Sequence, residues 1–117
     1  MPPSLPKLSA CFFQEIGTGN EPVREWLKSM SRYDRRAIGI DFQTVQFSWP
    51  IGKPLADHIE GDIWEIRTRL DNRVARILFV IEDASVVLLH GFIKKTQKTP
   101  LAELDIARQR LKRMRAR

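Results

Sequence analysis

IWEIRTRLDNRVARILFVIEDASVVLLHGFIKKTQKTP, residues 63–100, is the stretch of sequence that decides the fold. It contains three runs in which apolar residues alternate with polar ones or follow one another, as they do in strands. The expected strands cover residues 64–70, 74–82 and 86–93. Turns as short as those between them join antiparallel neighbours. The stretch therefore predicts a meander with a central middle strand, apolar on both faces apart from Arg76 and covered on one side by helices.

The alternation of side chains along these strands assigns each residue to a face of the sheet. In the first strand, Glu65, Arg67 and Arg69 are expected to point away from the apolar face. Arg76, in the middle strand, is expected opposite the main apolar face of that strand. In the third strand, the side chains expected to share one face are Leu88, His90 and Phe92.

The residues before the meander predict one strand and two helices. A first strand is expected within residues 8–16 and a helix over residues 20–30. A second helix is expected over residues 32–47, beginning after Ser31. The residues expected on its apolar face are Tyr33, Ala37, Ile40 and Thr44. An irregular loop follows because proline and glycine punctuate residues 50–54.

The residues after the meander predict a basic C-terminal helix over 99–117. Thr99 is expected to be its N-cap and Pro100 its first residue. The complete order is β-α-α-β-β-β-α, which predicts an α+β fold with an antiparallel sheet covered by helices. The 117 residues are expected to form a single domain, in which the proline-rich residues 1–7 are poorly ordered.

The net charge of +6 is concentrated at the C-terminal end. Residues 94–117 hold nine Lys and Arg against two Asp and Glu, whereas the first 93 residues are nearly balanced. Such an asymmetry indicates a polyanionic or acidic partner, although a solvated basic helix has the same composition. One cysteine and two distant histidines give no zinc spacing, so no metal or other cofactor is expected. No apolar run suits a membrane span or a signal peptide, which predicts a cytoplasmic protein with no membrane partner.

Two arginines within the strands are the sharpest functional candidates. Arg67 and Arg76 lie among apolar residues, where a charged side chain is costly to bury without a partner. Neighbouring antiparallel strands could bring them to one face, where two guanidinium groups would bind a phosphate. The alternative is a structural ion pair with Glu65 or Glu82, and the sequence leaves both interpretations open.

Further candidates lie at the end of the third strand. His90 could be a general acid or base, although a single histidine at a strand end is more often structural. Lys94, Lys95 and Lys98 form a basic turn that leads into a helix, where backbone amides add to the attraction of anions. Phe92 could stack on a base or belong to the core.

Four segments of the chain, taken in order, carry a resemblance to a known family. The segments that carry the resemblance are WPIGKP (49–54), IWEIR (63–67), ARILF (75–79) and LLHGFIKKTQKTP (88–100). Together they look like the phage-derived HigB-type branch of the RelE/ParE toxin superfamily, over residues 8–113.

The resemblance implies a RelE-like fold and the toxin of a type II toxin–antitoxin system. Members of this kind cut mRNA in the ribosomal A site without a metal, by attack of the RNA 2′-hydroxyl on the adjacent phosphate. By motif position, Arg67 and Arg76 would hold that phosphate, and Lys94 and Lys95 would bind the RNA backbone or the leaving group. His90 would be the proton shuttle. Arg69, Phe92 and Lys98 are the remaining candidates for RNA binding. One departure is the absence, after His90, of the tyrosine that many RelE-like toxins carry.

The resemblance also implies partners. These are a helix-turn-helix antitoxin, the ribosome with its mRNA, and operator DNA reached only through the antitoxin complex. Two other functions compete with the nuclease: a ParE-like toxin that inhibits gyrase by contact, and a non-catalytic, phage-derived binding module. The sequence does not decide whether Glu65 is the general base or the ion-pair partner of Arg67.

Overall fold

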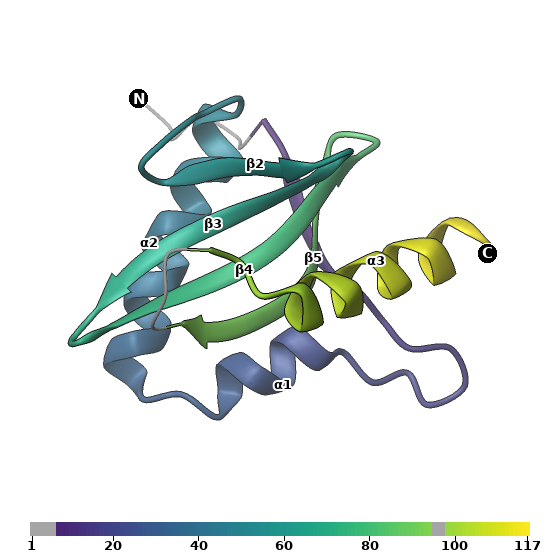
Figure 1. The fold of residues 1–117 in the computed structure, drawn as a ribbon, viewed down its shortest axis with the longest axis horizontal. Coiled ribbons are helices and arrows are strands. Elements are labelled where there is room, and N and C mark those ends of the chain that lie inside the picture. The colour runs from purple at the N-terminus through teal and green to yellow at the C-terminus, as the bar shows by residue number, and fades with distance from the viewer. Residues whose placement is uncertain (1–6, 95–97) are drawn as a thin grey trace, which may run out of the picture.

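The computed structural model describes residues 7–94 and 98–117, which form an α+β fold around one five-stranded sheet. The elements are β1 (Ser9–Phe12), α1 (Pro22–Lys28), α2 (Arg32–Ser48), β2 (Ala56–Glu60), β3 (Ile63–Leu70), β4 (Arg73–Glu82), β5 (Ser85–Lys94) and α3 (Leu101–Arg115). The strand order across the sheet is β1-β5-β4-β3-β2 (Figure 1). The predicted meander is confirmed as β3-β4-β5, with β4 at the centre. No helix in the described ranges is both long enough and apolar enough to span a bilayer.

The sheet differs from the prediction at both of its edges. A fourth antiparallel strand, β2, follows the expected loop and pairs with β3 in a segment where no strand was predicted, so the order is β-α-α-β-β-β-β-α. At the other edge, β1 pairs with β5 in parallel, so the prediction of an antiparallel sheet is wrong and the sheet is mixed. Both strands have only one neighbour, and edge strands of this kind are short or carry charges. Such strands show little of the apolar alternation on which a sequence prediction depends.

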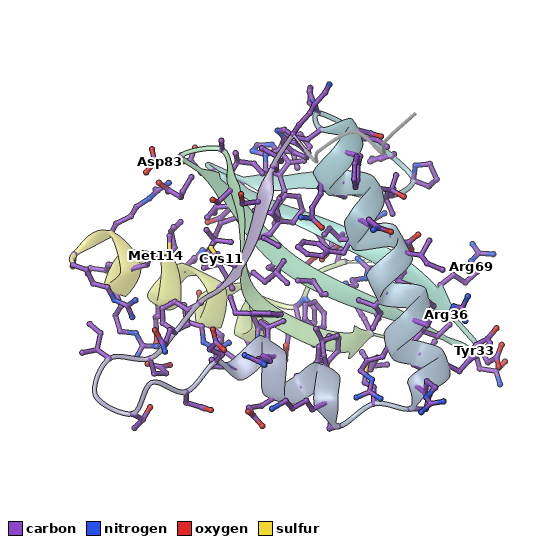
Figure 2. All side chains as sticks on the ribbon, turned by 180° about the vertical axis from the view of Figure 1, so that it is seen from behind. Cys11, Tyr33, Arg36, Arg69, Asp83 and Met114 are labelled. Atoms are coloured by element: carbon purple, nitrogen blue, oxygen red, sulfur yellow. The ribbon has the colours of Figure 1, made fainter. Side chains whose placement is uncertain are left out.

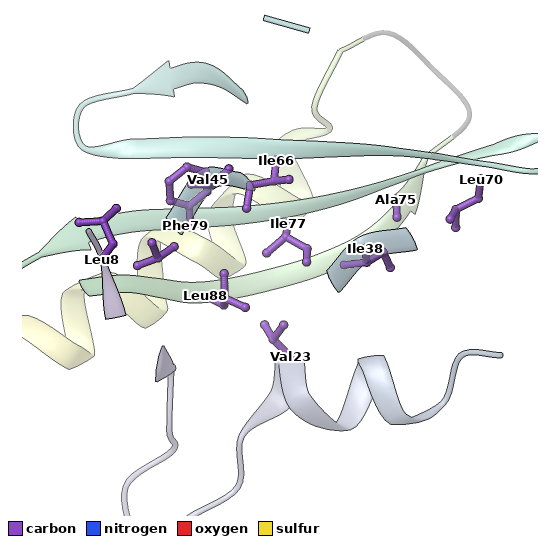
Figure 3. Close-up of a cluster of buried hydrophobic side chains, with 11 residues drawn as sticks. Leu8, Val23, Ile38, Val45, Ile66, Leu70, Ala75, Ile77, Phe79 and Leu88 are labelled. Carbon is purple, nitrogen blue, oxygen red and sulfur yellow. The ribbon is translucent and has the colours of Figure 1, made fainter. Parts of the chain in front are cut away.

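Helices cover both faces of the sheet and enclose two hydrophobic cores. α1 and α2 lie on one face, where the first core gathers residues such as Val23, Ile38, Ile77 and Leu88 (Figures 1 and 3). α3 lies on the opposite face, over a second core that includes Leu104 and Ala107 (Figure 1). The expectation that helices cover the middle strand on one side only is therefore wrong.

The face of α2 that packs on the sheet is not the predicted one. Its buried residues are Asp34, Ile38 and Val45, whereas Tyr33 and Ile40 point to solvent. The helix carries two apolar stripes at helical spacing, and the periodicity alone does not say which one is buried. Its start agrees with the prediction, because the Ser31 hydroxyl accepts a hydrogen bond of 3.1 Å from the Asp34 amide.

An irregularity in β5 sets which side chains face α3. The register with β4 shifts between Leu78 and Phe79, where β5 carries one extra residue. Leu88 therefore belongs to the first core, while Phe92 belongs to the second. The prediction that Leu88 shares a face with Phe92 is wrong, because a bulge changes the alternation of every later residue.

Gly91 lies where α1 packs closely on β5. A Cβ atom at this position would stand 2.4 Å from the Trp26 ring. Only glycine lets the helix approach the strand this closely. The contact shows that Gly91 faces α1, so its neighbours His90 and Phe92 face the opposite side of the sheet, toward α3.

Candidate functional site

The two strand arginines are direct neighbours across the sheet. Arg67 of β3 is the register partner of Arg76 of β4, and Arg76 is in turn the register partner of Phe92 of β5. The predicted juxtaposition of the two arginines is therefore present in the structure. The α3-side core includes Leu78, Val80 and Phe92, so this row of residues faces α3.

A buried carboxylate holds both arginines. The Glu65 side chain has 0% exposure. Its Oε1 atom accepts hydrogen bonds from Arg67 Nε at 3.0 Å and from Arg76 Nη1 at 2.8 Å. Its Oε2 atom accepts one of 2.7 Å from the Thr99 hydroxyl. A carboxylate buried this deeply requires such partners, and here they orient both guanidinium groups.

Arg67 lies at the open side of this arrangement. Its side chain is 30% exposed, compared with 7% for Arg76. The Nη2 atom of Arg67 donates a hydrogen bond of 2.9 Å to Asp57 Oδ2 on β2. Lys53 is 3.9 Å from the other oxygen of the same carboxylate. Arg67 is thus fixed by carboxylates on two strands and still reaches solvent.

Lys94 brings a further cation to the same place. It is 5% exposed, and its Nζ atom has no hydrogen-bond partner among residues 7–94 and 98–117. Burial lowers the pKa of Lys94, and the nearby Arg76 and Arg67 lower it further, while Glu65 opposes this shift. We call Asp57, Glu65, Arg67, Arg76, Lys94 and Thr99 the Glu65 cluster. Its three cations face two carboxylates, so an anion would complete it.

His90 lies beside the Glu65 cluster, in contact with α3. Its Nε2 atom is 2.5 Å from Glu103 Oε2, and its Nδ1 atom is 3.3 Å from Arg110 Nη1. Since a guanidinium can only donate, Nδ1 is the acceptor and Nε2 carries the proton, an assignment made from the hydrogen-bond network. Burial is the main cause that lowers the pKa of His90. Both ring nitrogens are therefore engaged, and the neutral ring stacks on Phe92 with 5.7 Å between centroids.

The remaining candidates are more dispersed. Arg69 is exposed on β3, and Phe92 is buried in the second core. Lys98 is exposed next to Thr99, and Lys95 lies outside the described residues. The structure therefore gathers Arg67, Arg76 and Lys94 into one cluster and places His90 with Phe92 at its border.

Several residues of this site were not singled out in the sequence. Asp57 belongs to the edge strand that was missed, and Glu103 and Arg110 come from the helix that faces His90. Thr99 was expected to cap α3, but Pro100 is the N-cap, the helix begins at Leu101, and the Thr99 hydroxyl turns to Glu65. A glutamate within an apolar strand was the one available signal, because its burial requires cationic partners.

Much of the C-terminal charge excess is engaged within the molecule. Arg108 contacts Glu60 and Asp105, and Arg115 contacts Asp62 and Glu82. Arg113 is 3.3 Å from Glu15. These carboxylates come mainly from strand ends and turns beneath α3. The basic helix is thus bound to its own sheet, which weakens the argument that its charge is held for a polyanion.

The comparison with protein families identifies the chain. Residues 25–112 match the family described as phage derived protein Gp49-like (DUF891), and the chain belongs to that family. This confirms the phage-derived part of the resemblance seen in the sequence. A comparison with curated proteins found no match. Within the described ranges, no group of three or more His, Cys, Asp or Glu residues is placed to hold a metal ion.

Proposed function

We propose that this protein is the toxin of a type II toxin–antitoxin system and acts as a ribosome-dependent mRNA endoribonuclease. The observation that carries the proposal is the Glu65 cluster, in which two oriented guanidinium groups lie beside a buried ammonium group without a hydrogen-bond partner among the described residues. Membership of the phage-derived Gp49-like family supports the toxin assignment.

The proposed reaction is cleavage of RNA by its own 2′-hydroxyl. The 2′-oxygen loses its proton and attacks the adjacent phosphorus, and the bond from phosphorus to the 5′-oxygen breaks. The products are a 2′,3′-cyclic phosphate and a 5′-hydroxyl, which takes up a proton. The requirement for a 2′-hydroxyl makes RNA the substrate and excludes DNA.

The cations of the cluster stabilise the charge that develops on the phosphate. Arg67, which reaches solvent, contacts a non-bridging oxygen first, and Arg76 and Lys94 provide charge behind it. Donors that are oriented before the substrate arrives need no reorganisation during the reaction, and removal of one typically costs about 10²–10³-fold in rate. Lys95, next to Lys94 in the chain, is proposed to bind the RNA backbone or the leaving group.

Glu65 acts in this proposal as a positioning residue and not as the general base. Its two carboxylate oxygens already accept hydrogen bonds from Arg67, Arg76 and Thr99. His90 remains the candidate proton shuttle, and it would have to leave Glu103 or Arg110 to exchange a proton with RNA.

The other proposed contacts surround the cluster. Arg69 and Lys98 are exposed and would bind neighbouring phosphates. Phe92 would stack on a base only if the second core opened, because it is buried there. The proposed partners are the ribosome with its mRNA and a helix-turn-helix antitoxin, whose complex with the toxin would bind operator DNA. The proposed location is the cytoplasm.

Induced expression in bacteria, with mRNA 5′ ends mapped at codon resolution, tests the proposal. The wild type should arrest growth and create new 5′ ends within translated codons, and Arg67→Ala should do neither. Arg108→Ala is the matched control, since Arg108 forms ion pairs on α3 away from the cluster. Growth arrest with DNA damage and intact mRNA would point to gyrase inhibition instead. Absence of arrest would leave a non-catalytic binding module.

A further inference from the structure

A second apolar stripe runs along the solvent side of α2. Tyr33 is 69% exposed, Ile40 is 55% exposed and Phe47 is 38% exposed. They are seven residues apart, so they lie on one side of the helix, with a drift of about 20° per step. We call these three residues the outer stripe of α2. It lies on the face of the sheet opposite the Glu65 cluster, and Figure 2 looks onto the helix from that side.

The spacing of the outer stripe is that of a helix-pairing seam. With the half-buried Ala37 and Thr44, the positions alternate at intervals of four and three residues, from 33 to 47. This is the repeat that places side chains between those of a second helix. Ala37 and Thr44 are small and would let the second helix approach closely. Ala37 also packs against the first core and Thr44 is half-buried, so the exposed part of the seam is Tyr33, Ile40 and Phe47. Three exposed large apolar side chains in register on one helix indicate a binding surface.

The charges beside the outer stripe select the partner. Arg32 and Arg36 are exposed in the first half of α2 on one flank of the outer stripe, and neither forms an ion pair or a side-chain hydrogen bond with another described residue. Cations near the N-terminus of a helix oppose its dipole, so these arginines do not stabilise α2 itself. Asp34 is buried and bound to Arg73, which leaves the half-buried Asp41 as the other acid of the helix. Figure 2 shows Arg36 and Tyr33 on the same outer side of α2.

We propose that the outer stripe of α2 binds an acidic amphipathic helix of a partner protein. The apolar side of that helix would cover Tyr33, Ile40 and Phe47, and its acidic flank would pair with Arg32 and Arg36. A second copy of this chain is disfavoured, because its own α2 offers these arginines no exposed carboxylate and the protein has a net charge of +6. The inference does not depend on the nuclease activity, since the surface lies across the sheet from the Glu65 cluster.

Two designed peptides test the charge and the shape of the surface. Each has 21 residues with leucine at the two apolar positions of every heptad, and one carries glutamate at the flanking positions where the other carries lysine. Fluorescence anisotropy with the purified full chain should show the glutamate peptide binding at least tenfold more tightly than the lysine peptide. Raising the salt concentration should weaken that binding, because exposed charges are screened.

Variants with matched controls locate the binding. Ile40→Ser should weaken the glutamate peptide at least tenfold, whereas Leu101→Ser should not change it, although Leu101 is just as exposed and apolar. Arg36→Glu should weaken it about fivefold or more, and Lys112→Glu on α3 should have little effect. Amide chemical-shift changes should be confined to α2 and its neighbours.

Three results would overturn the inference. Equal affinity for the two peptides would show that the surface does not prefer an acidic partner. Equal weakening by Leu101→Ser and Ile40→Ser would show that any exposed apolar residue serves. Sedimentation that shows a dimer of the wild type, lost in Ile40→Ser, would make a second copy of the chain the occupant.

Discussion

The Glu65 cluster and the arginines of α3 are both built from arginine–carboxylate ion pairs, but the ratio of arginines to carboxylates differs between them. On α3, Arg108 and Arg115 each face two carboxylates at the surface. In the Glu65 cluster, one buried oxygen of Glu65 serves two guanidinium groups, and a lysine stands beside them without a hydrogen-bond partner in the described ranges. Arg108 and Arg115 are therefore neutralised, whereas the cluster retains positive charge. An arginine count alone does not distinguish these two cases.

The largest expected effect comes from removing the shared carboxylate. Glu65→Ala removes the buried carboxylate that accepts a hydrogen bond from Arg76 Nη1, and breaking a buried ion pair in this way typically costs about 3–5 kcal/mol. Urea unfolding of the purified protein measures the loss. Glu82→Ala, which removes a surface carboxylate from Arg115, is the control and should cost much less. Equal losses for the two variants would break the comparison between buried and surface pairs.

Lys94 should show stability and activity moving in opposite directions. Lys94→Met removes a buried ammonium group that lacks a hydrogen-bond partner among the described residues, so the free energy of unfolding should rise by about 1 kcal/mol. If the proposed reaction is correct, the rate of mRNA cleavage should fall about 100-fold. Unfolding curves and cleavage assays on one preparation measure both quantities. A loss of stability would show that Lys94 is structural.

His90 should make stability depend on pH below neutrality. Its pKa is lowered in the folded protein, mainly by burial, so the unfolded chain binds the proton more readily. Its contribution is therefore complete above the unfolded pKa of about 6.5 and is lost as the pH falls from that value through the lower pKa of the folded state. Between pH 7.5 and 5.5 the wild type should lose more stability than His90→Phe. Parallel losses in the two proteins would assign the pH dependence to other groups.

The smallest effect is expected on α3. Arg115→Gln removes contacts with Asp62 and Glu82 that lie at the surface, where such pairs are worth about 0–1 kcal/mol. Thermal unfolding at low and high salt should show a small difference that salt abolishes. A loss as large as that of Glu65→Ala would mean that α3 is held mainly by its charges.

The strands that could be predicted most clearly from the sequence are those with a neighbouring strand on both sides in the sheet. The interior strands β3 and β4 are rich in apolar residues because each has a neighbouring strand on both sides, so both were recognisable as strands. The alternation of side chain direction along a strand then placed Arg67 and Arg76 on one face. The edge strands have one neighbour each, so β2 was missed and the parallel pairing of β1 was not foreseen.

The sequence identified the positively charged residues of the candidate site, but not the contacts that orient them. The contact of Arg67 with Asp57 depends on β2, and that of Thr99 with Glu65 joins residues 34 positions apart. No local pattern encodes either contact. The prediction of the buried face of α2 was wrong for a different reason. The helix has two apolar stripes, and the one that packs on the sheet contains Ile38 and Val45.

The extra residue in β5 decides, for every residue after it, which side of the sheet its side chain faces. Upstream of it, Leu88 faces α1 and α2, and downstream Phe92 and Lys94 take the opposite side. Loss of a single codon near Leu89 would exchange the two sides for everything that follows, directing Lys94 toward the first core and Gly91 away from Trp26. Insertions and deletions at this point are therefore far more damaging than substitutions, and a lineage that keeps the cluster must keep the length of this strand.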